Sequence, residues 1–399
     1  MKTRIAVFLG GRSPEHDVSV VSGLQALQAL DQTRFDPFVV YLTPQGDWLT
    51  GPGLDNRRNY LPDAQMRARL SEVTLDLAAG GQGRLAARKT GLFSRRPPIE
   101  FDVALLAFHG LGGEDGQMQG LFEAANIPYT GMRTMASAVL MDKVATKQIL
   151  AGSGIPLLRH AIIERPATGL PTAGALSEEM RLANIGFPCI VKPVHLGSSI
   201  GVGKAENIEE ARALLAPIFR LDTQAVIEPF VPNLVEYNIS VARFGGAPRC
   251  SAIEQPKRVE DLLDFRQKYL SGGDDKGGGK TLGTSSEGML SLTREINPDL
   301  PPEVADNIRR WALAAFAAAG GTGAPRIDFL CNEASGEIWL NEVNPCPGSF
   351  AFYLWEAAPE PVGFTRLLSL LIDEAQARHR AIQLPDDPVP QEARLLRRP

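Results

Sequence analysis

The chain reads Arg326-Ile327-Asp328 in one short apolar stretch and Asn341-Glu342-Val343-Asn344-Pro345 in another. Residues two apart in a β-strand share a face, so Arg326 points the same way as Asp328, and Glu342 the same way as Asn344. If the two strands are neighbours, an arginine, two carboxylates and an amide converge on one place. The alternative is a sheet face whose charges are simply solvated.

This set of side chains has a definite chemical preference. Oxygen atoms of Asp, Glu and Asn suit Mg²⁺, which shares its coordination shell with substrate phosphates. An arginine beside them suits the negative charge that develops on a transferring phosphoryl group. The two stretches therefore predict a magnesium-dependent phosphoryl-transfer site.

Composition narrows the class of protein. The chain has 399 residues, of which 44% are hydrophobic and 22% charged, a globular composition that indicates two or three domains. Its net charge of −5 argues against nucleic acid as a partner. Its four cysteines form no CxxC pair, which predicts reduced thiols and a cytoplasmic location. No apolar run is long enough to span a membrane, so no membrane partner is expected.

The order of expected elements predicts an α/β fold. Expected strands at 4–9, 36–42, 101–108 and 127–130 alternate with helices from Pro14 and at 116–125, which indicates a doubly wound N-terminal domain. Residues 44–100 are rich in Pro, Gly and Arg and are expected to form an irregular insertion. Further along, strands are expected at 187–194, 201–204, 225–229, 237–244, 324–331 and 338–343, with helices at 207–219 and 302–319.

Several residues in the middle of the chain are candidates for binding a nucleotide. Gly197-Ser198-Ser199-Ile200-Gly201 lies between two expected strands, where small residues let backbone N–H groups approach phosphate; a plain tight hairpin is the alternative. Lys192 interrupts an apolar run and must lie near a surface or an anion, and Lys143 is a second lysine for phosphate. The strand end at Glu228-Pro229-Phe230-Val231 could read a base edge, and Glu236 could bind ribose, although an edge strand and a loop glutamate would look the same.

Two N-terminal motifs are candidates for binding a substrate. Glu15 follows Gly10-Gly11 at the start of a helix and could hold an ammonium group, or could be only a helix-start residue. His109-Gly110 begins a glycine-rich segment at the carboxyl end of an expected parallel strand, where ligands gather in doubly wound sheets.

Together these residues resemble the D-alanine–D-alanine ligases of the ATP-grasp superfamily. The resemblance runs in family order from residue 10 to about residue 355. It rests on these segments: residues 10–19, 109–120, 141–143, 187–201, 228–236, 268–270, 326–328 and 342–348.

The resemblance implies a role for each matching residue. Lys143, Lys192 and Ser199 would hold the phosphates of ATP, with adenine at Glu228, Phe230 and Val231 and ribose at Glu236. Asp328, Glu342 and Asn344 would bind two Mg²⁺ ions, which Mn²⁺ could replace. The residues implied for catalysis and for the amino-acid substrates are Glu15, Ser198, Tyr269, Arg326, the backbone N–H of Gly348, His109, Lys268, Tyr353 and Leu354.

Three positions depart from the family pattern. Asp17 replaces a glutamate, and Pro229 replaces a lysine beside the adenine. Tyr353 stands where many members have a serine that binds the carboxylate of the second substrate. Either the tyrosine ring points away and D-alanine remains the acceptor, or the ring reshapes the acceptor pocket.

The implied activity is ATP-dependent joining of two D-alanine molecules through an acyl phosphate, for peptidoglycan. Two alternatives to this activity are open: the same chemistry with a different acceptor, and nucleotide binding without turnover. The expected architecture has a Rossmann-like N-terminal domain at 1–142, a central ATP-grasp subdomain at 143–233 and a C-terminal ATP-grasp subdomain with the magnesium site at 234–382. A flexible tail is expected at 383–399, and the chain is expected to assemble as a homodimer. The glycine-rich segment 271–283 is expected to be a lid over the nucleotide.

Overall fold

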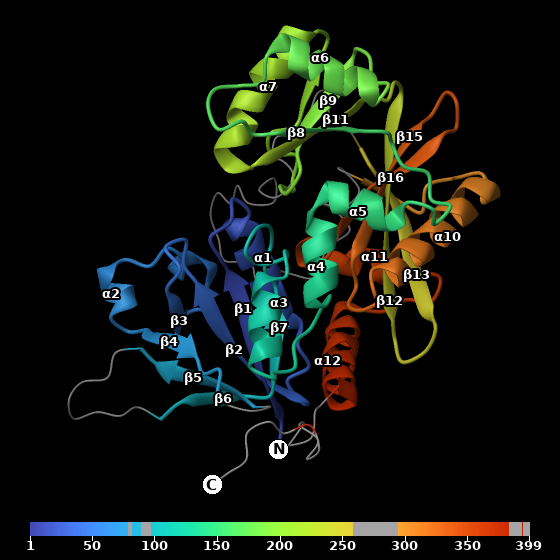
Figure 1. The fold of residues 1–399 in the computed structure, drawn as a ribbon. Helices are drawn as coiled ribbons and strands as arrows, with labels where there is room; N and C mark the ends of the chain where they lie inside the picture. The colour runs from blue at the N-terminus through green and yellow to red at the C-terminus, as the bar shows by residue number, and fades with distance from the viewer. Residues whose placement is uncertain (79–81, 89–96, 258–293, 383–392, 394–399) are drawn as a thin grey trace, which may run out of the picture.

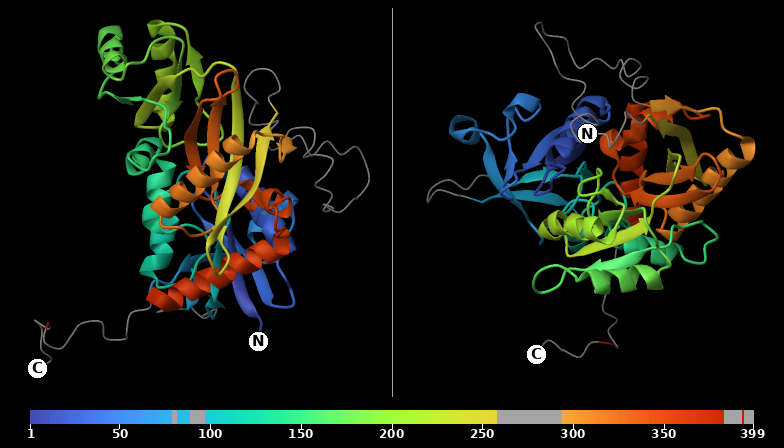
Figure 2. Two further views of the ribbon diagram at one scale, coloured as in Figure 1. Left: turned by 90° about the vertical axis from the view of Figure 1, so that its right-hand side faces the viewer. Right: turned by 90° about the horizontal axis from the view of Figure 1, so that it is seen from above.

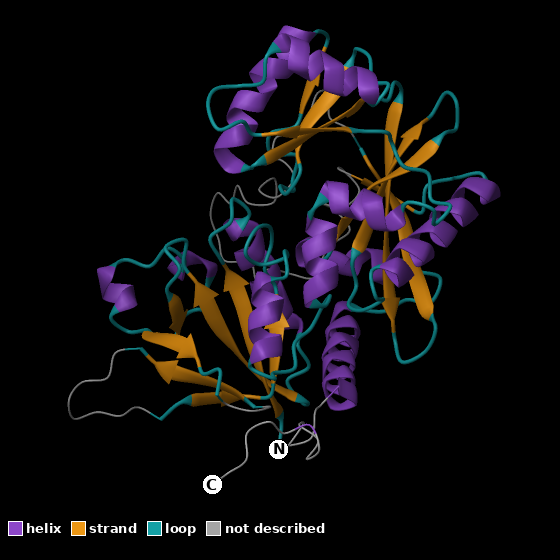
Figure 3. Ribbon diagram, viewed as in Figure 1, coloured by secondary structure: helices purple, strands orange, loops and turns teal. Residues whose placement is uncertain are grey.

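The computed structural model of the chain describes residues 1–78, 82–88, 97–257, 294–382 and 393. These residues form three β-sheets with helices packed on them (Figures 1 and 3). In Figure 1 the first sheet lies at the lower left, the second at the top and the third at the right. The predicted α/β class is confirmed.

The first sheet is mixed, with seven strands in the order β6-β5-β4-β3-β2-β1-β7. Strand β1 is parallel to β2 and β7, and the remaining pairs are antiparallel. The predicted β-α-β alternation therefore describes the parallel part of the sheet. The strands are β1 (Thr3–Gly10), β2 (Phe35–Leu42), β3 (Trp48–Thr50), β4 (Ser71–Leu75), β5 (Gly83–Ala87), β6 (Ile99–Phe101) and β7 (Val103–Leu106).

The prediction of an irregular insertion at residues 44–100 is wrong. Strands β3 to β6 lie in this range and extend the first sheet. They are short and separated by glycine, proline and arginine, which hides the alternation that buries Leu49, Val73 and Leu85. The strand expected at 127–130 is reduced to an isolated bridge between Tyr129 and Ala104.

Helices cover both faces of the first sheet, so the middle of β1 is completely buried. Val7 and Leu9 pack with Leu24 on one face, and Ala6 and Phe8 pack in a separate core on the other. The helices of this part are α1 (His16–Ala29), η1 (Arg57–Asn59), α2 (Ala64–Arg67) and α3 (Gln117–Ala124).

The second sheet is antiparallel, with the order β10-β9-β11-β8. Helices α6 and α7 pack against it (Figure 1). Asn207 caps the N-terminus of α7, because its side chain accepts the Glu210 N–H at 3.0 Å. Its elements are β8 (Ala161–Glu164), α6 (Ala173–Leu182), β9 (Cys189–Pro193), β10 (Gly203–Ala205), α7 (Ile208–Leu221) and β11 (Gln224–Pro229).

The third sheet is also antiparallel, with the order β14-β13-β12-β15-β16. Its elements are β12 (Leu234–Arg243), β13 (Pro248–Pro256), β14 (Arg294–Ile296), α10 (Pro302–Ala318), β15 (Arg326–Asn332) and β16 (Ile338–Asn344). Helices α4 (Thr134–Met141) and α5 (Lys143–Leu150) connect the first sheet to the second and contact β16.

The last helices return the chain to the first sheet. After η2 (Gly348–Ala351) and α11 (Phe352–Glu356), α12 (Phe364–Ile382) packs against β7 and α1 (Figure 2). Leu367 and Ile372 of α12 share one core with Ile5 of β1. No helix within the described ranges combines the length and the apolarity needed to cross a bilayer.

Candidate active site

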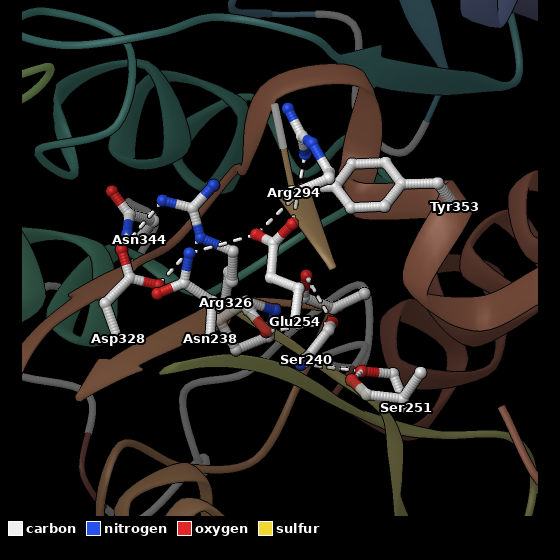
Figure 4. Close-up of polar contacts among 12 residues, drawn as sticks. Asn238, Ser240, Ser251, Glu254, Arg294, Arg326, Asp328, Asn344 and Tyr353 are labelled. Atoms are coloured by element: carbon white, nitrogen blue, oxygen red, sulfur yellow. Dashed lines mark hydrogen bonds and ion pairs between the residues drawn. The ribbon is translucent and has the colours of Figure 1, made fainter. Parts of the chain in front are cut away.

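The hairpin of β15 and β16 brings the four polar side chains predicted from sequence to one face. Arg326 is opposite Asn344, and Asp328 is opposite Glu342. Nε and an Nη of Arg326 donate to both carboxylate oxygens of Asp328 at 2.7 Å each, and Nδ2 of Asn344 donates to Asp328 at 2.9 Å (Figure 4). Burial raises the pKa of Asp328 to about 6; Arg326 opposes this increase, while Glu342 and Glu254 add to it.

Two lysines from outside the third sheet reach this hairpin. Nζ of Lys143, the first residue of α5, lies 3.4 Å from a carboxylate oxygen of Glu342 and donates to the Leu196 carbonyl at 2.6 Å. Nζ of Lys192 on β9 donates to Oδ1 of Asn341 at 2.9 Å. The hairpin therefore faces two buried cations across the junction between the second and third sheets.

Glu228 holds Lys192 in place together with a third lysine, Lys147 of α5. Glu228 is 2% exposed, with one oxygen 2.7 Å from Nζ of Lys192 and the other 2.8 Å from Nζ of Lys147. Burial alone would raise the pKa of Glu228, but Lys192 and Lys147 more than offset this and hold the pKa at about 2. Sequence reasoning missed Lys147, although its spacing of four from Lys143 on one helix was a usable signal.

The other residues predicted to bind adenine and ribose follow Glu228 closely in the chain. Phe230 has Nζ of Lys204 4.4 Å from its ring centroid, and Val231 is buried. Glu236 is half-buried near the start of β12, in register with Leu330 of β15.

The glycine-rich loop 197–201 meets the N-terminal part of the chain. Ser198 and Ser199 have positive φ angles of 53° and 59°, which turn the loop sharply. The hydroxyl of Ser198 donates to the carboxylate of Glu15, the residue that precedes α1. Two residues predicted to share a substrate site are thus brought together from distant parts of the sequence.

A buried histidine–glutamate pair connects the first sheet to the turn around Gly348. Glu114 accepts the N–H of Gly110 at 2.5 Å and that of Cys346 at 2.9 Å. His109 hydrogen-bonds Ser22 at 2.9 Å, and Ser22 accepts the Ser349 N–H at 2.9 Å. Burial lowers the pKa of His109 to about 4, and burial together with the charge of Glu15 raises the pKa of Glu114 to about 8. Glu114 and Ser22 were not predicted as site residues.

Comparisons with known proteins agree with this arrangement. The family described as "D-ala D-ala ligase N-terminus" matches residues 4–132, and "D-ala D-ala ligase C-terminus" matches residues 149–373. The chain belongs to the D-alanine–D-alanine ligase family. A D-alanine–D-alanine ligase of Heliobacterium modesticaldum is 33% identical over 96% of this chain and 97% of its own length. One from Deinococcus radiodurans is 32% identical over 94% of this chain and 100% of its own length.

Solved structures of similar proteins confirm the fold. The D-alanine–D-alanine ligase of Coxiella burnetii superposes with a TM-score of 0.76 at 24% identity, covering 95% of each chain. The D-Ala:D-Ser ligase VanG of Enterococcus faecalis superposes with a TM-score of 0.71 at 24% identity, covering 94% of this chain and 100% of that chain. The three-sheet architecture of this D-alanine–D-alanine ligase family member is the ATP-grasp fold.

The remaining predicted residues of this family member fall into two groups. Lys268, Tyr269 and the expected lid at 271–283 lie outside the described residues. Leu354 is completely buried, so its side chain packs in the core. The ring of Tyr353 does not point away from the polar face, because its hydroxyl donates to Glu254 at 3.1 Å.

The donor set on the hairpin fits a hard divalent cation. Within the described part of the chain, no three or more His, Cys, Asp or Glu side chains are grouped as metal ligands. The predicted set differs from such a group, because it combines the carboxylates of Asp328 and Glu342 with the amide of Asn344. These are all oxygen donors, the kind that Mg²⁺ prefers. The charge of Glu342 also raises the pKa of Asp328, and a bound cation would offset that repulsion.

His195, just before the glycine-rich loop, predicts a pH-dependent stability. Its ring lies 3.4 Å from Asp142 and 2.7 Å from Asp222, and hydrogen bonds to both raise its pKa to about 9. Between its ordinary pKa of 6.5 and about 9, the folded protein binds more protons than the unfolded chain, so stability falls as pH rises. The contacts of protonated His195 with Asp142 and Asp222 should contribute about 1 kcal/mol to the free energy of unfolding, a value that allows for partial exposure of the ring.

Melting temperatures of the wild type and His195→Gln at pH 6, 7.5 and 9.5 measure this contribution. The wild type should melt higher than the variant at pH 6, and the difference should shrink toward pH 9.5. A difference that is independent of pH would show that His195 does not stay protonated in the fold.

Proposed function

We propose that this chain joins two D-alanine molecules at the expense of ATP, releasing ADP and phosphate and supplying D-alanyl-D-alanine for peptidoglycan. The observation that carries the proposal is the junction where Lys143 and Lys192 face the β15–β16 hairpin, which bears Arg326 and Asp328. Cations on one side and oxygen donors with an arginine on the other are what a transferring phosphoryl group requires. The relatives named D-alanine–D-alanine ligase, matched over nearly their whole length, support the same activity.

ATP is proposed to lie between the second and third sheets. Lys143, Lys192 and the backbone at Ser199 bind its phosphates, with adenine near Phe230 and Val231 and ribose at Glu236. The role expected for Glu228 at the adenine changes, because both of its carboxylate oxygens are engaged by Lys147 and Lys192. Glu228 instead positions Lys192 and reaches the nucleotide through it.

Asp328, Glu342 and Asn344 are proposed to hold two Mg²⁺ ions, with Mn²⁺ as a substitute. When bound, such ions neutralise charge on the phosphates during transfer.

The amino-acid substrates are proposed to lie on the opposite side of the glycine-rich loop. Glu15, positioned by Ser198, binds the ammonium group of the first D-alanine, with His109 behind it and Tyr269 and Lys268 completing the site. The carboxylate of this D-alanine attacks the γ-phosphorus and ADP leaves. The amine of the second amino acid then attacks the acyl carbon and phosphate leaves, while Arg326 and the N–H of Gly348 stabilise the tetrahedral oxyanion.

A second candidate function keeps this chemistry and uses a different acceptor. The observation that favours it is the hydrogen bond from Tyr353 to Glu254, which keeps the tyrosine ring at the predicted acceptor position. Nucleotide binding without turnover is disfavoured, because a binder alone does not require Arg326, Asp328, Glu342 and Asn344 together.

The proposal includes the domain division after residues 142, 233 and 382, a homodimer and a cytoplasmic location. The described cysteines are free thiols, as a reducing compartment would keep them.

ADP release with and without D-alanine tests the function. The rate should depend on D-alanine, and mass spectrometry over a panel of D-amino acids, D-hydroxy acids and simple amines should identify D-alanine as the best acceptor. ADP release that is independent of any amino acid would refute ligation.

A further inference from the structure

A row of polar side chains crosses the third sheet, from the β15–β16 hairpin to β13. In register, Glu254 of β13 is opposite Asn238 of β12, Asn238 is opposite Asp328, and Asp328 is opposite Glu342. Adjacent strands are about 4.8 Å apart, so the backbone at Glu254 lies about 10 Å from that at Asp328. The row connects the proposed catalytic hairpin to a second charged cluster (Figure 4).

Glu254 is the centre of this second cluster. It is 2% exposed and accepts three hydrogen bonds: from an Nη of Arg294 at 3.1 Å, the Tyr353 hydroxyl at 3.1 Å and Nδ2 of Asn238 at 2.9 Å. Cζ of Arg294 also lies 4.5 Å from the centroid of the Tyr353 ring. The guanidinium is therefore held from two sides, by a buried carboxylate and by an aromatic face.

Arg294 has donors beyond those that this cluster uses. Its side chain is 24% exposed, in contrast to Glu254. Its Nε is buried and finds no hydrogen-bond partner among the described residues. A guanidinium has five N–H donors in a planar fork that matches a carboxylate, so a held arginine with unused donors is suited to binding one.

Resting on the proposed function, we propose that Arg294 binds the carboxylate of the second amino acid, and that Glu254 and Tyr353 position it. The arginine takes over the task that a serine hydroxyl would perform at position 353, where the tyrosine hydroxyl is committed to Glu254. The acceptor is therefore an amino acid or another carboxylate-bearing nucleophile, and not a simple amine.

A competition between two acceptors in one reaction tests this assignment. D-alanine serves as donor and acceptor, and D-alaninamide, which has no carboxylate to activate, serves only as acceptor. The wild type should form D-alanyl-D-alanine in large excess over D-alanyl-D-alaninamide. Arg294→Met should reduce that excess on the order of 100-fold, the value of a charge-assisted hydrogen-bonded pair. Arg294→Lys should retain part of it, and Tyr353→Phe should lower it several-fold while the constants for ATP and the first D-alanine stay unchanged.

The product ratio is measured within each reaction, so it does not depend on how much active enzyme a variant yields. Arg309→Met removes an exposed arginine of α10 and should leave the ratio at the wild-type value. An unchanged ratio in Arg294→Met would overturn the assignment, as would an unchanged ratio in Tyr353→Phe if Arg294→Met failed to fold. A wild type that forms neither product would instead refute the proposed function.

Discussion

Replacing Glu342 by glutamine should lower D-alanine-dependent ADP release on the order of 1000-fold. Glu342 lies opposite Asp328 and 3.4 Å from Nζ of Lys143, where it would hold Mg²⁺ together with Asp328 and Asn344. Glutamine keeps the size of the side chain but removes the charge, so the lost attraction to two divalent cations should appear almost entirely in the rate. The melting temperature should change by only a few degrees, because Glu342 is only partly buried.

The measurement is turnover as a function of Mg²⁺ concentration. Glu337→Gln is the matched control, since Glu337 is an exposed glutamate at the turn of the same hairpin. Wild-type turnover of Glu342→Gln at saturating Mg²⁺ would remove Glu342 from the metal site.

Replacing Lys192 by alanine should cut the rate by about 10²–10³, the usual cost of losing one preorganised charged contact. Lys192 is held between Glu228 and Asn341, so its Nζ is fixed where the second and third sheets meet. Its loss also leaves the buried Glu228 with Lys147 as its remaining cation, which should lower the melting temperature.

Lys192→Arg separates the two effects, because it keeps the charge near Glu228 while displacing the point of contact with phosphate. In both Lys192→Ala and Lys192→Arg, the KM for ATP should rise and kcat/KM for ATP should fall. Arg181→Ala, which removes an exposed cation from α6, should behave as the wild type. If the ATP constants and the rate of Lys192→Ala stayed within a few-fold of wild type, Lys192 would have a structural role alone.

Local spacing in the sequence predicted one side of the candidate site. The four hairpin residues could be placed together because the period of a strand is two, and the strands β15 and β16 are consecutive. Lys192 could be singled out because a lysine in an apolar run needs an anion, although nothing in the sequence identified Glu228 as that anion.

The opposite side of the site depends on long-range register. Glu254 and Arg294 meet Tyr353 only because β13 and β14 pair at the edge of the third sheet, and no spacing along the chain encodes that contact. Local spacing was also insufficient to predict part of the first sheet. The short strand β3 pairs not only with its neighbour β2 but also with β4, which follows η1 and α2 in the chain, so residues 44–100 looked irregular when read alone.

Transfer of ¹⁸O from D-alanine tests the central claim most directly. In a reaction with ATP and D-alanine labelled with ¹⁸O in the carboxylate, the attacking oxygen becomes the bridging oxygen of the acyl phosphate. It should leave with phosphorus when the second amine attacks. The account predicts one ¹⁸O in each phosphate released, one ADP for each D-alanyl-D-alanine formed, and no AMP. Unlabelled phosphate, or ¹⁸O recovered in AMP, would contradict an acyl-phosphate ligase.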